Sequence, residues 1–135
     1  VLTRVEAPTM SLDVVSVHLD FKRDSERRAQ LDDITLHLLE REDAPDHLVV
    51  AGDFNCAFNG RGDVLREFVR RHSLGGYETP VETFPSRRPR RALDHVLVSS
   101  SIEVRRTVAV PALVSDHLPV LAELAPRAPA VPSSR

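Results

Sequence analysis

Hydrophobic positions in the first half of the chain follow two different periods. The segment Leu12–Leu19 is rich in β-branched residues, which is typical of a strand. From Ser25 to Glu42 the apolar residues recur at helical spacing, and Asp24 or Ser25 is expected to cap the first turn. The short apolar run Leu48–Ala51 predicts a strand that is buried on both faces.

The second half adds one helix and several strands. Gly60–Gly62 predicts a flexible link before a second helix, and the Ala/Pro/Ser composition from Ala125 onward predicts a disordered tail. The predicted elements between them are a helix at Asp63–His72 and strands at Ala92–Ser99, Ile102–Val110 and Pro119–Leu124. The order β-α-β-α-β-β-β predicts an α/β layered architecture.

Composition narrows the function classes. The 135 residues suit one domain, and 41% hydrophobic with 28% charged residues is an ordinary globular balance. A net charge of -2 provides no overall basic field for nucleic acid or an anionic membrane. No apolar run reaches the roughly 18–20 residues of a membrane-spanning helix. Cys56 is the single cysteine, so we expect a packing residue and neither an intrachain disulfide nor a cysteine-based zinc cluster.

Polar residues at the ends of predicted strands are the candidates for chemistry. Asp53 and Asn55 follow the run Leu48–Ala51 and, being two apart on extended backbone, share a face. Such an oxygen-rich pair suits a hard cation or a phosphate. The alternative is a plain turn, because Gly, Asp and Asn are turn residues.

Four further residues have both a functional and a structural interpretation. In Ser115–Pro119, Asp116 and His117 place a carboxylate beside an imidazole that titrates near neutral pH, or they belong to an ordinary loop. Asp94 interrupts a strand and needs a partner if it is buried, or it faces solvent on an edge strand. His18 at the end of the first strand is either catalytic or merely exposed.

Taken together, four segments resemble the endonuclease/exonuclease/phosphatase superfamily with its DNase I-like fold. They are Val17-His-Leu19, Gly52-Asp-Phe-Asn55, Leu93-Asp-His-Val-Leu-Val98 and Ser115-Asp-His-Leu-Pro-Val120. The resemblance spans residues 14–124 and covers only the C-terminal half of the family domain. It implies half of a four-layer α/β sandwich over residues 1–125, with one mainly antiparallel or mixed sheet and two covering helices, followed by a tail at 126–135.

The resemblance also implies a role for each residue. His117 would be the general base on water, and Asp94 would fix its tautomer by accepting the other ring N–H. Asp116 would be a metal-side carboxylate. Asp53 would orient the nucleophile or protonate the leaving oxygen, with a second part in metal binding. Asn55 would hold a phosphate oxygen, and His18 matches a second imidazole of the DNase- and sphingomyelinase-like branches.

The implied activity is phosphate-ester hydrolysis of the phosphodiesterase type, supported by Mg²⁺ or Mn²⁺. Its substrate would be a nucleic acid, a phospholipid headgroup or a small phosphate ester. The principal metal-binding Glu of the family belongs to the other half, and Glu6 does not fit its place. We therefore expect weak activity, and either a missing N-terminal half or self-association through an exposed sheet face. The alternative is a non-catalytic remnant or binding module.

Two points are left open by the residues alone. The run Pro85–Arg91 holds four arginines that could clamp a phosphodiester or simply form a solvated loop. We expect no secretory leader ahead of the first predicted strand. The compartment stays open, with the bacterial cytoplasm preferred.

Overall fold

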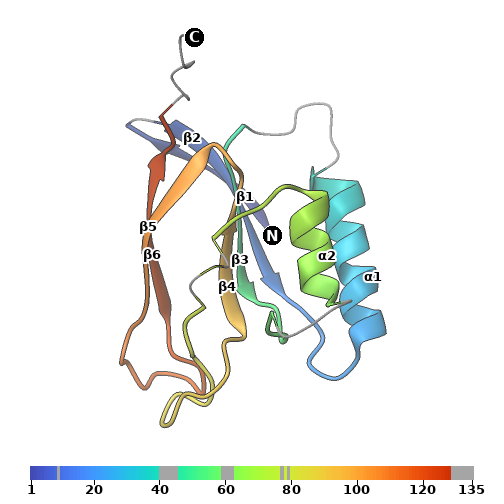
Figure 1. The fold of residues 1–135 in the computed structure, drawn as a ribbon, viewed down its shortest axis with the longest axis vertical. Helices are drawn as coiled ribbons and strands as arrows, with labels where there is room; N and C mark the ends of the chain where they lie inside the picture. Colours follow the sequence, from blue (N-terminus) through green and yellow to red (C-terminus); the bar gives the residue numbers. More distant parts are fainter. Residues whose placement is uncertain (9, 40–45, 59–62, 77, 79, 129–135) are drawn as a thin grey trace, which may run out of the picture.

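A computed structural model describes the chain except for residues 9, 40–45, 59–62, 77, 79 and 129–135. Its elements, shown in Figure 1, are β1 (Leu2–Ala7), β2 (Met10–His18), α1 (Asp24–Ile34), the π-helical segment η1 (Thr35–Leu39), β3 (Leu48–Asp53), α2 (Val64–Arg71), β4 (Asp94–Val98), β5 (Ile102–Ala109) and β6 (Val120–Pro126). No helix among the described residues combines the length and apolarity that crossing a bilayer requires.

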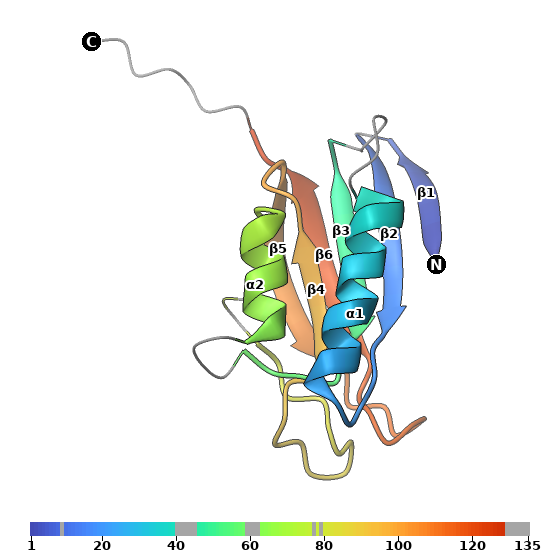
Figure 2. The same cartoon turned by 90° about the vertical axis from the view of Figure 1, so that its right-hand side faces the viewer.

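The strands form a mixed four-stranded sheet and a separate two-stranded one. The order in the larger sheet is β1-β2-β3-β4, with β2 and β3 parallel and the outer pairs antiparallel. Strands β5 and β6 pair antiparallel with each other. Helices α1 and α2 cover one face of the larger sheet, and the β5–β6 hairpin lies on the opposite side (Figures 1 and 2). The α/β class with two helices agrees with the prediction, whereas the single expected sheet is divided in two.

Strand alternation distributes the core over the two faces of the sheet. On the helix side, Val15, Val50 and Leu97 come from neighbouring strands and pack beneath Leu65 and Phe68 of α2. Val50, Leu65 and Leu97 are all fully buried, and each such side chain stabilises the fold by about 1.5–3 kcal/mol relative to exposure.

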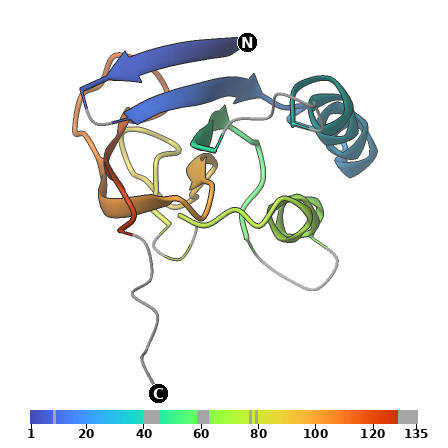
Figure 3. The same cartoon turned by 90° about the horizontal axis from the view of Figure 1, so that it is seen from above.

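On the hairpin side, Val49 and Val98 pack with Ile102. In the view from above, the β5–β6 hairpin and the two helices lie on opposite sides of the larger sheet (Figure 3).

Strand β1 was not predicted from the sequence, because its residues show no alternation of polar and apolar side chains between exposed and buried positions. Almost all of Leu2–Ala7 is exposed, so no alternation of buried residues marks it. Its place is set by pairing with β2 and by a two-pronged ion pair, in which Arg4 Nε and Nη2 donate to Asp13 at 2.7 and 3.0 Å. Glu6 pairs across from Ser11 at the start of β2, at the opposite end of that strand from His18.

The first helix begins as predicted but is capped differently. Neither Asp24 nor Ser25 is the N-cap; Arg23 holds that position, without a side-chain cap bond. The Asp20 carboxylate instead accepts from the backbone N–H groups of Lys22 and Arg23, at 2.9 and 2.7 Å. The α-helix ends at Ile34 and continues as η1, and the rest of the predicted helix, residues 40–42, lies outside the described residues.

Differences at the remaining elements are small. Asp63 caps α2 by accepting from the Leu65 backbone N–H at 2.9 Å. The last strand runs to Pro126, so Ala125 is a buried strand residue and the predicted start of a tail there is wrong. The predicted link at residues 60–62 and tail residues 129–135 lie outside the described part of the chain.

Candidate active site

Three polar side chains form a row across the end of the larger sheet. His18 pairs with Asp53 in the β2–β3 register, and Asp53 pairs with Asp94 in the β3–β4 register. Residues two apart on a strand point to the same face. Each of the three lies an even number of residues from an apolar residue on the hairpin side of the sheet, such as Ala51 for Asp53 and Val96 for Asp94. The register therefore places all three on one face, on adjacent strands.

Gly52 permits the close packing of β2 and β3 just before this row. Its φ is +141°, and a Cβ there would lie 2.0 Å from the Val17 carbonyl oxygen. Only glycine combines that backbone geometry with so close an approach. The glycine before Asp53 is therefore a requirement of the strand pairing.

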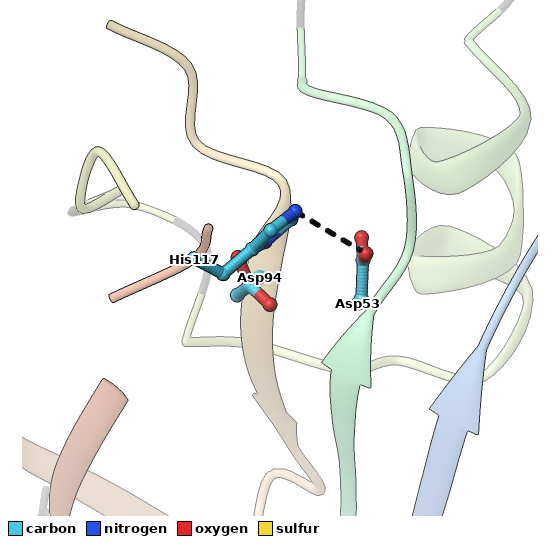
Figure 4. A group of neighbouring side chains, drawn as sticks. All are labelled: Asp53, Asp94 and His117. Carbon is cyan, nitrogen blue, oxygen red and sulfur yellow. Dashed lines mark hydrogen bonds and ion pairs between the residues drawn. The ribbon is translucent and has the colours of Figure 1, made fainter. Parts of the chain in front are cut away.

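His117 reaches the row from the loop that precedes β6. The adjacent Leu118 N–H donates to the Thr83 carbonyl oxygen at 2.9 Å, which fixes the loop against the segment before β4. His117 Nδ1 lies 2.7 Å from Asp94 Oδ2. Its Nε2 faces Asp53, 3.8 Å from Oδ2, as Figure 4 shows.

The electrostatic surroundings of His117 favour its protonated form. Desolvation opposes protonation, since the side chain is only 21% exposed. The hydrogen bond and charge of Asp94, with the charges of Asp53 and Asp116, outweigh that penalty and raise the pKa of His117. The contact with Asp94 thus fixes Nδ1 of the His117 ring and leaves Nε2 directed into the site.

Thr83 and Phe84 complete this arrangement and were missed in the sequence. The fully buried Thr83 donates from its hydroxyl to Asp94 Oδ2, the oxygen that also meets His117. The Phe84 ring packs against the His117 ring with centroids 4.9 Å apart. Both lie in a proline-containing segment without periodic pattern, so nothing in the sequence linked them to Asp94.

Asn55 and Asp116 lie beside the row, and His18 is its exposed end. Asn55, at φ 51°, donates from its backbone N–H to Asp53 Oδ1 at 2.8 Å, and its side-chain amide donates to the Leu19 carbonyl oxygen at 2.8 Å. His18 is mostly exposed, with Nε2 3.7 Å from Asp53 Oδ2. Asp116 is exposed, and its Oδ1 accepts from the Ser115 hydroxyl at 3.1 Å.

All six predicted site residues line one cleft with a volume of about 530 Å³. The remaining lining residues are Phe21, Phe84, Arg91, Leu93 and Ser115. From the arginine-rich run, Arg91 lines the cleft, with its guanidinium 5.8 Å from the centre of the Phe84 ring. Its location in the cleft favours a role at the site for Arg91, one of the four arginines of Pro85–Arg91.

The donor set suits a hard divalent cation with few protein ligands. Single ligand atoms of Asp53, Asp94 and His117 all lie within 4.8 Å of one another. Asp94 Oδ2 accepts from Thr83 and contacts His117. Asp53 Oδ1 accepts from the Asn55 backbone N–H, whereas its Oδ2 faces His117 Nε2 at 3.8 Å across the site. Mg²⁺ is commonly held by one or two carboxylates together with waters and substrate phosphates, so these residues fit such an ion.

Cys56 lies near the site but has a packing role. It is partly buried against the core beneath the helices. Burial, followed by the charge of Asp63, raises the pKa of its thiol to about 12. A thiol so rarely ionised is a poor nucleophile. The interpretation of Cys56 as a packing residue therefore agrees with the structure.

Comparisons with solved structures identify the fold. The chain superposes on an endonuclease/exonuclease/phosphatase protein of Beutenbergia cavernae (TM-score 0.73, 19% identity, 93% of this chain and 38% of that one). A member from Bacteroides vulgatus gives 0.69 at 24% identity, with 87% and 50% covered. A mannosyl-6-phosphatase of Bacteroides thetaiotaomicron gives 0.66 at 20% identity, with 85% and 51% covered. A search of curated proteins finds no match.

The chain spans 38% to 51% of the length of these three structures, and the fold that they share is DNase I-like. The model of the Endonuclease/Exonuclease/phosphatase family matches residues 4–117, which include five of the six predicted site residues at positions 18 to 116 and His117 as the last matched residue. With this match over most of its length and the fold shared with those structures, the chain belongs to the endonuclease/exonuclease/phosphatase family.

Proposed function

We propose that this chain carries the proton-transfer half of the active site of a metal-dependent phosphate-ester hydrolase. The observation that carries the proposal is the continuous contact from Asp94 through His117 to Asp53 inside the cleft. The sequence resemblance and the family membership point to the same chemistry.

His117 is the proposed general base. Its Nδ1 is engaged by Asp94, so the proton sits on that nitrogen in the neutral ring and Nε2 is free to take a proton from an attacking water. Asp94 then stabilises the imidazolium that forms, and Thr83 holds Asp94 in place. General acid–base help of this kind contributes about 10²–10⁴-fold.

The remaining residues bind and orient. Asp53 positions the water or the leaving oxygen and, with Asp116 at the rim, holds the cation, which we propose to be Mg²⁺ or Mn²⁺. Such an ion, when bound, neutralises phosphate charge and stabilises the departing oxygen. Asn55 keeps one amide hydrogen beyond its bond to Leu19, and we assign that hydrogen to a phosphate oxygen. His18 assists from the exposed side of Asp53.

The substrate is proposed only as a phosphate ester. The mannosyl-6-phosphatase among the similar structures supports a sugar-phosphate type of substrate, and the family description also supports nucleic acid. A phosphodiester or phospholipid headgroup remains within the same proposal, because the roles proposed for the row concern only the phosphate group and the attacking water.

We also propose that the hairpin side of the sheet accepts a partner, either the other half of the domain or a second copy. Leu12, Val14 and Val96 are only partly buried there, and Val114 and Leu121 on the neighbouring segments are 81% and 46% exposed. Exposed apolar surface of this kind marks association sites. Light scattering tests self-association, and a stable monomer at high concentration contradicts it.

The test of the proposed function begins with binding, because the chain corresponds to half of its relatives and we expect weak turnover from it alone. Paramagnetic Mn²⁺ is titrated into isotope-labelled chain with inorganic phosphate present. Amide signals near Asp53, Asn55 and His117 should broaden first. Asp53→Ala should remove this effect, and Asp32→Ala, which changes an exposed carboxylate of α1, should leave it unchanged.

Turnover is then measured on bis(p-nitrophenyl) phosphate and p-nitrophenyl phosphate. Metal-dependent turnover should fall at least about 10²-fold in His117→Ala. Broadening distributed elsewhere, or turnover indifferent to His117→Ala, contradicts the proposal. The alternative, a non-catalytic binding module, predicts phosphate binding in the cleft without turnover even when the other half is supplied.

A further inference from the structure

Phe21 lies in the cleft although its ring contributes nothing to the core. It is 69% exposed and lines the same cavity as His18, Asp53 and Asn55. A single exposed apolar side chain is common on protein surfaces and means little by its exposure alone. Its position beside the proposed phosphate-binding residues is what calls for a physical explanation.

The turn that carries Phe21 is held firmly by the preceding residue. The Asp20 carboxylate accepts from two backbone N–H groups of the turn, at 2.9 Å from Lys22 and 2.7 Å from Arg23. The Asp20 backbone N–H donates to Gln30 at 2.8 Å, and its carbonyl oxygen accepts from Arg27 at 2.7 Å. Because both α1 residues anchor the turn, the Phe21 ring is presented at the cleft with little backbone freedom to lose on binding.

The surroundings of the ring suit an anionic ligand that carries a ring of its own. The Lys22 ammonium lies over the Phe21 ring, 4.9 Å from its centre, and adds positive charge at this side of the cleft. The other phenyl ring of the cleft, Phe84, is packed against His117 and beneath Arg91. Among the described lining residues, Phe21 is thus the phenyl ring with a largely uncovered surface.

We propose that Phe21 is a specificity-determining residue that stacks against a planar ring on the leaving group of the substrate. The inference rests on the proposed function, since it places the phosphate at His117 and Asp53 and the remainder of the ester toward the β2–α1 turn. A preorganised aromatic side chain provides large contact area and a preferred stacking geometry. The substrate class is accordingly an aryl or nucleobase-type phosphate ester rather than an acyclic one.

The test compares phenyl phosphate with glycerol 2-phosphate, using inorganic phosphate as the reference, by NMR titration of cleft amides in the presence of Mg²⁺. The chain should bind phenyl phosphate about three- to tenfold more tightly than glycerol 2-phosphate. Phe21→Ala should abolish this preference and leave the affinity for inorganic phosphate within about twofold. Phe21→Tyr should restore the preference.

Leu36→Ala is the matched control, because it removes a similarly exposed apolar side chain from η1 outside the cleft, and it should change neither affinity. Equal affinities for the two esters, or a preference that survives Phe21→Ala, overturns the inference and leaves the proposed function standing. Failure of every probe to bind, or binding that is unaffected by His117→Ala and Asp53→Ala, overturns both.

Discussion

Replacing Gly52 with alanine tests the physical basis of the catalytic row. The new Cβ would lie 2.0 Å from the Val17 carbonyl oxygen, at a backbone φ of +141°. Holding a non-glycine residue in such a region costs about 1–3 kcal/mol, and displacing packed backbone adds about 1–3 kcal/mol more. We therefore expect Gly52→Ala to lower the free energy of unfolding by about 2–6 kcal/mol, a large part of the total for a domain of this size.

Urea denaturation followed by circular dichroism measures this change. With a slope of about 1–3 kcal/mol per molar urea, the midpoint should fall by about 1 M or more. Gly75→Ala is the matched control, because a Cβ there meets only the Glu78 carboxylate at 3.6 Å, an ordinary contact. Its effect should stay within about 0.5 kcal/mol. Equal stability of the two variants would refute the close approach of β2 and β3 on which the row depends.

Two further predictions concern titratable groups. Asp94→Asn removes the main contribution that raises the pKa of His117, so an NMR titration should show a lower pKa; an unchanged value contradicts the contact. A histidine whose pKa is raised on folding stabilises the folded state at pH values below its ordinary pKa, and this stabilisation is lost as the pH rises through the pKa of the folded state. The stability advantage of the unmodified chain over Asp94→Asn should therefore be larger near pH 6 than near pH 9. Burial raises the pKa of Cys56 to about 12, so alkylation by iodoacetamide at pH 8 should be more than about 10²-fold slower in the folded chain than in urea, and equal rates would show that the thiol is accessible and ionised.

The sequence was informative where side chains repeat with a secondary-structure period or follow a recognisable segment. The strand at Leu48–Ala51 and the helix capped by Asp63 are determined by local pattern, and both are present. The convergence of Asp53, Asp94 and His117 followed from the resemblance, since their separation along the chain gives no local sign of proximity. Their roles in catalysis remain predictions.

Features set by tertiary contacts could not be predicted. Strand β1 forms by antiparallel pairing with β2, to which the Arg4–Asp13 ion pair adds, and its exposed residues show no alternation. Thr83 and Phe84 owe their place to the backbone bond between Leu118 and Thr83, which links two loops distant in sequence. Phe21 is in the cleft because Asp20 shapes the turn, an effect of one carboxylate on two neighbouring N–H groups.

The most direct test of the central claim is a crystal structure of the chain grown with Mn²⁺ and inorganic phosphate, in which anomalous scattering locates the metal. We expect a Mn²⁺ ion bound by the Asp53 carboxylate, a phosphate oxygen within hydrogen-bonding reach of Asn55, and His117 still paired with Asp94. An ion and phosphate bound elsewhere, or Asp53, Asp94 and His117 separated from one another, would contradict the claim.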